Sequence, residues 1–301
     1  MEEKPVIPKS QLPSVVRKEL QDFVLVGGGT YTAGKITGND SFSKYIEEKR
    51  ITVSSFYMDK YEVTVEDYMA FYNETSDTAD KPDTLCFFRD FEGFYQKWAE
   101  VYYWHPKYRK YPICGVNLSQ AKQYCAWKTA KVNAMLKTSN SNLKVVFRLP
   151  TVYELEYSMV EDEHYLENYT FNAVTYFKSV NAGNVADTNN LVIKHPGEDG
   201  YYWQAPVKSY KPNENGAYNL QGNVAEWTQS TVAGTFYTDT TMDGTDGHNP
   251  VRVADTSYYI VKGGSFAHGL YYIQPGAAMP VKSSEQHSWL GFRLVMEITA
   301  E

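Results

Sequence analysis

Short runs of hydrophobic and β-branched residues punctuate the first half of the chain, and each run predicts one element. Phe23–Val26 is an apolar run that stops at Gly27-Gly28-Gly29, which predicts a strand entering a turn. Tyr31–Gly34 then reads as the second arm of a hairpin. Ile51–Asp59 is rich in β-branched and aromatic residues and predicts a strand, and Val145–Pro150 predicts another that ends at its proline.

A spacing of three and four residues between apolar positions predicts helices. Val65–Tyr72 has this spacing, with Thr64 as a plausible N-cap. Gln120–Leu136 predicts a second, longer helix for which Ser119 supplies the cap. Thr151 is expected to cap a third, short helical stretch.

Helical periodicity disappears from residue 161 onward. Short apolar pieces alternate there with Asn, Gly, Asp and Pro, and no internal repeat is present. The pattern predicts small strands that carry very long loops, and loops of that length are usually functional or pinned by ions. Residues 1–22 are polar with three prolines and predict a tether and a short helix, so we expect a single domain over residues 23–301.

Composition excludes several classes of protein. Of the 301 residues, 43% are hydrophobic and 22% are charged, which indicates a globular chain. The net charge of −7, without a basic stripe, argues against nucleic-acid binding. No apolar run approaches the roughly 20 residues that span a bilayer, and the polar N-terminus lacks the apolar core of a secretion signal.

Cysteine and histidine offer little obvious chemistry. Cys86, Cys114 and Cys125 are an odd number, so a bridge between Cys114 and Cys125 is possible, but buried free thiols are the favoured interpretation. The six histidines show no two-histidine metal spacing. His268 and His287 lie in an irregular segment near the C-terminus, where a surface role is favoured over a metal or catalytic one.

Five blocks of sequence occur in a fixed order. They are Tyr61–Thr64, Arg148–Tyr157, Asn219–Thr228, Lys262–Phe266 and Gly291–Val295. Together they resemble the formylglycine-generating-enzyme (sulfatase-modifying factor) family, a branch of the C-type lectin fold, over roughly residues 23–297. The resemblance implies an α+β fold with two helices, small strands and long loops. Within these blocks, Trp227 and Arg293 are expected to be framework residues.

The Asn219–Thr228 block carries closely spaced oxygen ligands. An amide, two backbone carbonyls and a carboxylate come from Asn219, Gly222, Val224 and Glu226, a set that suits Ca²⁺. The alternative is that Asn219 and Glu226 only hydrogen-bond the loop backbone. The family resemblance implies a structural calcium ion at these positions.

The resemblance implies a second calcium site as well. Its ligands would be Asn181, the Ala182 carbonyl, Asp199 and the Tyr201 carbonyl.

The chain departs from the active enzymes of this family in one respect. Those enzymes carry a redox pair of cysteines shortly after the Gly-Gly-Ser-aromatic block, where they hold copper and oxidise a substrate cysteine. Ala267–Pro280 contains no cysteine, and this chemistry needs the sulfur atoms themselves. We therefore expect no copper, no formylglycine synthesis and no enzyme activity.

The irregular segment resembles the variable region of a second group. Within this fold, variable proteins of diversity-generating retroelements, including treponemal lipoproteins, carry a rewritten segment between a Gly-Gly-Ser-aromatic start and a Gly-Phe-Arg end. Here that segment is residues 263–293. The expected ligand-contacting residues are Phe266, Ala267, His268, Leu270, Tyr271, Tyr272, Gln274, Glu285, His287 and Trp289.

This second resemblance implies a non-enzymatic protein that binds a protein or glycan ligand, one carried by another cell or a host. It also implies display at the cell surface as an outer-membrane lipoprotein, with residues 1–22 as the stalk that follows a removed lipid anchor. Two alternatives stay open. One is a catalytically inactive structural paralogue of the gliding-motility and secretion lipoprotein type. The other is an iron-dependent sulfoxide synthase, which would need a histidine triad that the spacing does not supply.

Overall fold

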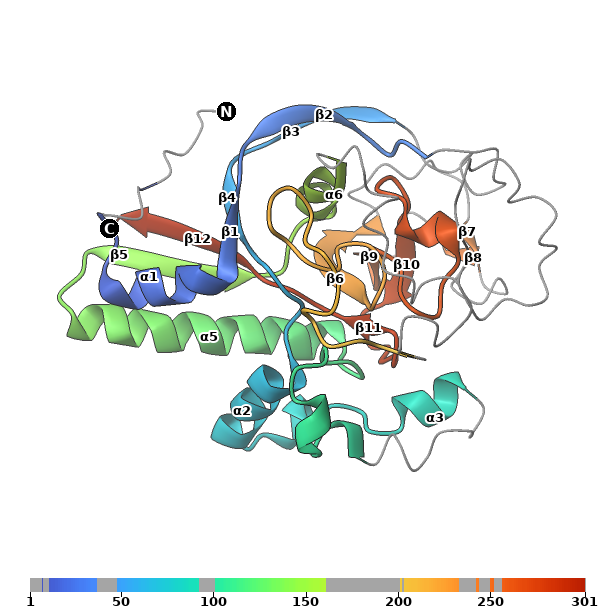
Figure 1. Ribbon diagram of the computed structural model, residues 1–301, viewed down its shortest axis with the longest axis horizontal. Coiled ribbons are helices and arrows are strands. Elements are labelled where there is room, and N and C mark those ends of the chain that lie inside the picture. Colours follow the sequence, from blue (N-terminus) through green and yellow to red (C-terminus); the bar gives the residue numbers. More distant parts are fainter. Residues whose placement is uncertain are drawn as a thin grey trace.

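The computed structural model describes residues 7, 11–36, 48–91, 101–160, 201, 203–232, 242–243, 250–251 and 256–300. These parts of the chain form two four-stranded sheets, two strand pairs and several helices, which is the expected α+β fold (Figure 1).

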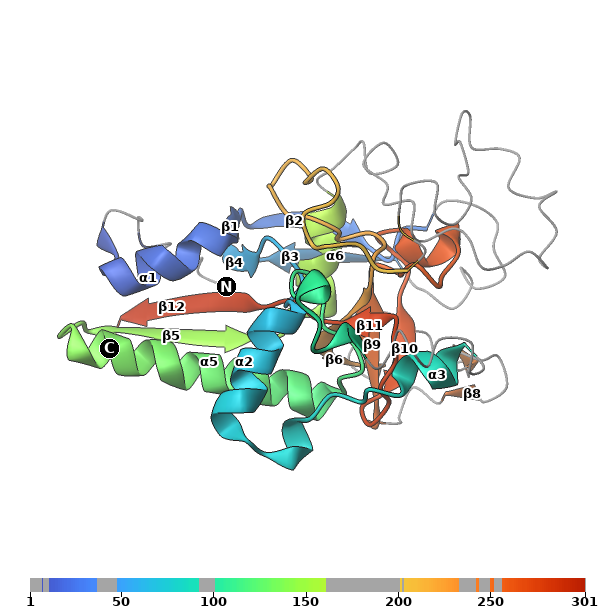
Figure 2. The ribbon, with the colours of Figure 1, turned by 60° about the horizontal axis from the view of Figure 1, so that its bottom comes forward.

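The first sheet is antiparallel and has the order β1-β4-β12-β5. Its strands are β1 (Phe23–Val26), β4 (Phe56–Asp59), β12 (Val295–Ala300) and β5 (Leu143–Arg148). The longest helix, α5 (Leu118–Thr138), runs alongside β5 and β12 (Figures 1 and 2). The strand that follows the irregular segment is therefore an interior strand of this sheet.

The second sheet has the order β10-β9-β6-β11 and carries the irregular segment. Its strands are β10 (Met279–Lys282), β9 (Tyr258–Lys262), β6 (Ala225–Thr231) and β11 (Leu290–Gly291), and only β6 and β11 are parallel. A 3₁₀ turn, η9 (Leu270–Ile273), lies between β9 and β10.

The strand that follows β1 does not fold back on it, so the predicted hairpin is wrong. Instead β2 (Gly29–Ala33) pairs with β3 (Lys49–Val53) in the register that already joins β1 to β4. Figure 1 shows the two pairs as one long, bent ribbon. A Cβ on Gly28 would lie 2.9 Å from the Ser55 backbone nitrogen, so glycine permits a close crossing inside the ribbon rather than a turn.

Further elements complete the described parts. The remaining α-helices are α1 (Ser14–Glu19), α2 (Val65–Thr75), α3 (Cys86–Asp90) and α6 (Val152–Val160). The other 3₁₀ turns are Leu20–Asp22, Thr78–Asp80 and Pro106–Tyr108, and β7 (Met242–Asp243) pairs with β8 (Pro250–Val251). No helix in these ranges is both long and apolar enough to cross a membrane.

Two helix starts follow the sequence prediction. The Thr64 hydroxyl accepts a hydrogen bond from the Asp67 backbone nitrogen at 3.2 Å, which caps α2. At α6 the Thr151 hydroxyl accepts from the Glu154 nitrogen at 3.1 Å, and the Glu154 carboxylate accepts from the Thr151 nitrogen at 2.7 Å. The second arrangement is a complete capping box.

The start of α5 differs from the prediction. Asn117 caps this helix, because its side chain accepts from the Gln120 nitrogen at 3.0 Å while the Gln120 side chain accepts from the Asn117 nitrogen at 2.9 Å. Ser119 lies inside the first turn and is exposed. The helix begins two residues earlier than its apolar periodicity indicates.

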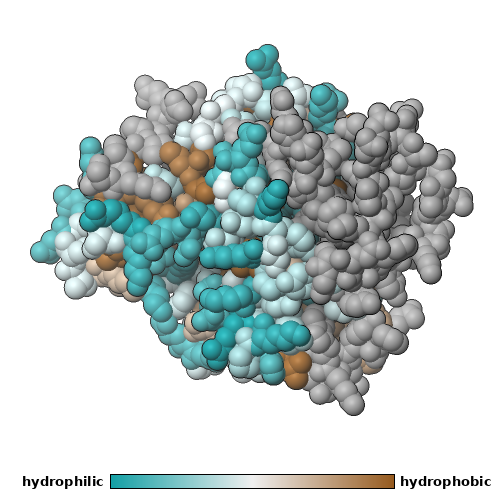
Figure 3. Space-filling view, in the orientation of Figure 1, coloured by the Kyte–Doolittle hydropathy of each residue, from teal (hydrophilic) through white to brown (hydrophobic). Residues whose placement is uncertain are grey.

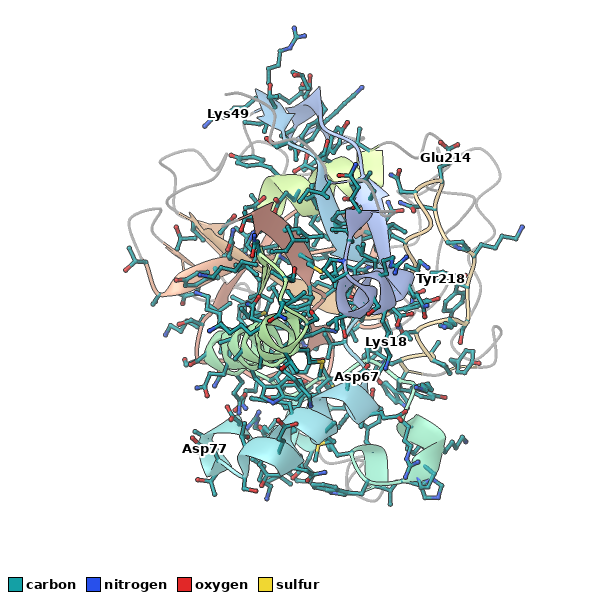
Figure 4. The ribbon with its side chains drawn as sticks, turned by 90° about the vertical axis from the view of Figure 1, so that its left-hand side faces the viewer. Lys18, Lys49, Asp67, Asp77, Glu214 and Tyr218 are labelled. Carbon is teal, nitrogen blue, oxygen red and sulfur yellow. The ribbon has the colours of Figure 1, made fainter. Side chains whose placement is uncertain are left out.

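The core consists of two clusters. The larger one packs α2 and α5 against the first sheet, with stacked rings of Tyr68 and Tyr124 and an edge contact to Phe292. The smaller one fills the space between the ribbon, α6 and the second sheet. Charged side chains such as Lys49 and Asp77 point outward at opposite ends of the molecule (Figure 4). Cys86, Cys114 and Cys125 are buried free thiols, which confirms the favoured interpretation.

A groove opens where β12 diverges from β4. It has a volume of about 570 Å³, and its lining includes Leu25, Ile51 and Ile298. Figure 3 shows hydrophobic surface in this region, to the left of a mostly hydrophilic face. None of the site residues expected from the sequence lines this groove.

Candidate binding site in the C-terminal segment

Two glycines begin the irregular segment. Gly263 and Gly264 follow β9 with positive φ angles of 87° and 60°. A Cβ on Gly263 would lie 2.6 Å from the Leu220 carbonyl oxygen, and the Gly263 carbonyl accepts from the Gly222 nitrogen at 2.7 Å. Only glycine tolerates both the left-handed backbone and this close approach. The start of the segment is therefore fixed against the Asn219–Glu226 loop.

Arg293 fixes the other end of the segment. Its guanidinium is fully buried and forms a bidentate pair with Glu226, through Nε to Oε2 at 2.7 Å and Nη2 to Oε1 at 2.6 Å. It also donates to the Tyr218 carbonyl at 2.8 Å and to the Asp59 carbonyl at 3.2 Å. Trp227 is fully buried and donates to the Val116 carbonyl. Both residues are framework, as the sequence predicts.

The expected contact residues divide by exposure. Phe266 is buried against Phe91 and Trp203, and Leu270 is the first residue of η9. Trp289 is only 8% exposed, so the expectation that it would be an exposed contact is wrong. The partly exposed members of the set are Ala267, His268, Tyr271, Tyr272, Gln274, Glu285 and His287.

Five rings of the expected contact set form one cluster, which we call the aromatic cluster: His268, Tyr271, Tyr272, His287 and Trp289. His287 stacks on Trp289 with ring centroids 4.4 Å apart, and Trp289 meets His268 edge to face at 4.7 Å. His268 contacts Tyr272 at 5.1 Å, and Tyr272 contacts Tyr271 at 5.1 Å. Trp289 is buried because two imidazoles cover it, and its ring packs against both of these partly exposed side chains.

The two histidines have opposite charge preferences. Burial opposes the charge on His287, but the hydrogen bonds of its Nδ1 to Asp90 at 3.0 Å and its Nε2 to Glu285 at 3.2 Å outweigh burial and raise its pKa to about 9. Burial lowers the pKa of His268 to about 3, and the charge on His287 lowers it further. His268 Nδ1 lies 2.6 Å from the Ser265 hydroxyl. At neutral pH the cluster therefore combines one imidazolium with one neutral imidazole.

Asp90 is the residue that sequence reasoning missed. Besides His287, it accepts hydrogen bonds from the backbone nitrogen and the hydroxyl of Ser288, both at 2.6 Å. It ends α3, 197 positions away from His287, and no local pattern distinguishes it from a surface aspartate. Only the fold brings the two together.

The first expected calcium site consists of Asn219, Gly222, Val224 and Glu226, which lie close together in the sequence and are buried. Asn219 has a φ of 54° and donates to Glu62 at 3.0 Å, while its Oδ1 is buried without a hydrogen-bond partner. Glu226 is bound by Arg293. The carbonyl-bearing residues Gly222 and Val224 lie between them. An unpartnered buried amide oxygen fits a cation ligand, and a carboxylate that holds one guanidinium keeps further lone pairs.

The second expected calcium site falls mostly outside the described residues. Asn181, Ala182 and Asp199 lie there, whereas Tyr201 is described and its ring contacts Tyr111. Across the described ranges, no group of three or more His, Cys, Asp or Glu side chains is arranged to hold a metal ion. That finding concerns side chains and does not test sites built on backbone carbonyls.

The fold and these framework contacts define a class of protein. Residues 8–298 match the family of the sulfatase-modifying factor enzyme 1-like domain. The chain belongs to this family, which confirms the fold class that the five sequence blocks imply.

Two curated relatives that match this chain carry different names. The formylglycine-generating enzyme of Mus musculus is 27% identical over 240 residues, which cover 69% of this chain and 58% of the mouse protein. The serine/threonine-protein kinase pkn1 of Chlamydia pneumoniae is 24% identical over 248 residues, which cover 81% of this chain and 33% of the kinase. The chain thus matches little more than half of the first relative and a third of the second.

Three solved structures share the fold. PvdO from Pseudomonas aeruginosa has a TM-score of 0.56 and 19% identity, over 91% of this chain and 94% of PvdO. Treponema denticola variable protein 1 has a TM-score of 0.52 and 18% identity, over 91% and 94% of the two chains. CarF has a TM-score of 0.53 and 18% identity, over 91% and 97%. At such identities the likeness concerns the fold alone.

Proposed function

We propose that this chain is a non-enzymatic ligand-binding protein that presents its binding surface on residues 266–289. One observation carries the proposal: the segment is held at both ends by buried framework, while the aromatic cluster between them is partly exposed. Gly263 and Arg293 are the fixed ends. Side chains on a rigid support lose little conformational freedom when a ligand binds, so their contacts contribute more to affinity.

The chemistry of the cluster suits non-covalent recognition. Tyr271 and Tyr272 offer flat apolar faces with hydroxyl groups, and aromatic side chains dominate the affinity of many interfaces. His287 and Glu285 add one positive and one negative group at 3.2 Å from each other. A protein or glycan surface with hydroxyl and carbonyl groups would match this mixture.

We also propose a structural calcium ion beside the binding segment. Asn219 Oδ1, the Glu226 carboxylate and the carbonyls of Gly222 and Val224 would hold it. Bound there, the ion would supply positive charge to a loop that is crowded with buried carboxylates, because Glu62 accepts from Asn219 and Asn223 in the same place. The Tyr201 carbonyl would belong to the second calcium site. The proposal includes no copper.

The finer part of the proposal is that residues 263–293 form the variable region of a diversity-generating retroelement. The shared fold of Treponema denticola variable protein 1 supports it, as does the cysteine-free segment between intact framework blocks. The ligand would then lie on another cell or a host, and the chain would be displayed as an outer-membrane lipoprotein. Sequencing many natural copies of the gene tests this part. Differences should concentrate in codons 266–290 and trace to adenines in a nearby near-copy, and an invariant segment without a near-copy would refute it.

A binding experiment tests the function itself. The purified chain is applied to a glycan array and to a panel of cell surfaces, beside the Tyr271→Ala/Tyr272→Ala variant. The variant should lose at least about 10-fold in binding, because truncating a central interface anchor costs about 2 kcal/mol and a 10-fold loss corresponds to about 1.4 kcal/mol. Tyr61→Ala is the matched control, since Tyr61 is a partly exposed tyrosine that contacts the Tyr218 ring outside the segment. Equal losses in the two variants would contradict the proposed surface.

The mouse relative carries the name of an enzyme, so the enzymatic alternative needs its own test. The chain is incubated with copper, oxygen, a thiol reductant and a cysteine peptide of the kind found in sulfatases. We expect the peptide mass to stay unchanged, because Ala267–Pro280 has no cysteine. Conversion of the peptide cysteine to an aldehyde would overturn the non-enzymatic proposal. Large complexes without measurable ligand binding would instead favour a structural paralogue.

A further inference from the structure

Two buried thiols share one tyrosine hydroxyl. The Cys86 sulfur lies 3.4 Å from the Tyr103 oxygen, and the Cys114 sulfur lies 3.6 Å from the same atom. Both cysteines are fully buried. Burial and the neighbouring Cys86 raise the pKa of the Cys114 thiol. No other pair of cysteines in the chain has this arrangement, because the third cysteine, Cys125, lies on α5.

The pair lies on the two chain segments that hold His287. Cys86 begins α3, and the last residue of α3 is Asp90, which binds His287 and Ser288. Cys114 precedes Gly115, whose nitrogen donates to the His287 carbonyl at 2.9 Å. A covalent bond between the thiols would therefore tie together both supports of the aromatic cluster.

We propose that Cys86 and Cys114 form an intramolecular disulfide when the protein meets a disulfide oxidant such as oxidised glutathione. One cysteine thiolate attacks a glutathione sulfur and releases one reduced glutathione. The second thiolate then attacks the resulting mixed disulfide and releases another. Two protein thiols are oxidised, one glutathione disulfide is reduced, and the two protons end on the two released thiols.

The environment of the pair determines how the reaction proceeds. Since both sulfurs are buried and thiolate formation at Cys114 is disfavoured, the folded chain should react slowly, through transient opening around α3. Refolding in the presence of the oxidant should be faster, because both thiols are then accessible. Once formed, the disulfide closes the loop between residues 86 and 114, and this constraint stabilises the folded state.

The test uses the full-length chain. Folded protein, and protein refolding from urea, are incubated with a mixture of oxidised and reduced glutathione, then unfolded, alkylated and digested. We expect one protein species lighter by two hydrogens, a linked peptide that contains Cys86 and Cys114, and alkylation of Cys125 alone. A dithiol reductant should restore three alkylated cysteines. Labelling of all three cysteines in both incubations would overturn the proposal, and so would linkage to Cys125 or stable glutathione adducts.

Serine variants separate this pairing from general thiol reactivity. Cys125→Ser should form the disulfide like the natural chain and show the same upward shift of Tm on oxidation. Cys86→Ser and Cys114→Ser should form no internal disulfide and show no shift. Equal Tm shifts in all three variants would contradict the assignment.

The effect of the disulfide on the aromatic cluster rests on the proposed binding function, whereas its formation does not. In the glycan-array and cell-surface assay, oxidised protein should dissociate more slowly than reduced protein. If the disulfide forms but the dissociation rate does not change, the proposed effect of the disulfide on binding is wrong, while the disulfide itself stands. If neither the oxidised nor the reduced protein binds, the result counts against the proposed binding function.

Discussion

Arg293 shows how one side chain can join distant parts of the chain. Its guanidinium binds the Glu226 carboxylate and the backbone of Tyr218 and Asp59, so it connects β4, β6 and the loop before Asn219. The pair is almost fully buried, with side-chain exposures of 0% and 2%. A buried charge is tolerated only when its partner and hydrogen bonds are complete, so loss of either partner should be costly.

We expect Arg293→Met to lower the free energy of unfolding by about 3–5 kcal/mol, because it leaves Glu226 buried without its counterion. Urea denaturation measures this change. Lys110→Met is the matched control, since its pair with Glu66 is 70% and 46% exposed and should contribute at most about 1 kcal/mol. Equal losses in both variants would show that Arg293 is not the framework residue described above.

The raised pKa of His287 predicts a pH dependence. Its folded-state pKa of about 9 lies above the usual 6.5, so its contribution to stability is complete below about pH 6.5 and is lost as the pH rises through 9. The free energy of unfolding should therefore fall between pH 7 and 9, by at most about 1.4 kcal/mol per pH unit. Urea titrations across this range measure the slope, and ring NMR signals report the charge.

Asp90→Asn should lower the pKa of His287 and flatten this slope, because Asp90 is the better buried of its two acidic partners. Glu285→Gln should have a smaller effect, since Glu285 is 38% exposed and more screened by solvent. If the His287 ring titrates near its usual value in the unmodified protein, the described hydrogen bonds are absent in solution.

At the scale of elements, α5 offers a direct comparison between sequence and structure. Asn117→Ala should lower the free energy of unfolding by about 1 kcal/mol, because Asn117 accepts from the Gln120 nitrogen in the capping box. Ser119→Ala, at the cap expected from the sequence, should change it by less than about 0.5 kcal/mol. Thermal or urea unfolding measures both losses of stability. A larger loss for Ser119→Ala than for Asn117→Ala would show that Ser119 caps the helix and that α5 begins at Gln120.

Local signals predicted the elements whose causes are local. The starts of α2 and α6 depend on residues within one helical turn, so Thr64 and Thr151 could be identified from the sequence. The pairing of β1 with β4 could not, because the glycines at 27–29 read as a turn when only neighbouring residues are considered. Gly28 is needed because the Ser55 backbone lies close to it, and Ser55 is far from Gly28 in the sequence.

The candidate site divides in the same way. The sequence located both framework ends and all five residues of the aromatic cluster, since those residues lie in one segment. Asp90 escaped notice because it reaches the site through tertiary packing of α3, which no periodicity encodes. The burial of Trp289 was missed for a related reason, as it depends on the two imidazoles that cover it.

At the scale of the whole molecule, the calcium proposal predicts a stability that depends on the ion. Saturating Ca²⁺ should raise the Tm by several degrees relative to a chelator, because an ion that binds only the folded state stabilises it. In Asn219→Ala this difference between Tm values should shrink, whatever the variant does to stability itself. Calorimetry or fluorescence melting measures the Tm of the natural chain and of the variant, each with calcium and with a chelator. Identical Tm values with calcium and chelator would remove calcium from the proposed function.

The order of the chain around β12 has a consequence for variation in the binding segment. This strand is synthesised after residues 266–289, yet it occupies an interior position in the first sheet, between β4 and β5. A stop codon or frameshift within the segment would therefore remove or scramble a strand that two neighbours need. Such products would fail to fold and would be degraded, whereas single-residue replacements would leave β12 intact. If residues 263–293 vary as proposed, only copies in which both the segment and β12 are translated in frame would fold.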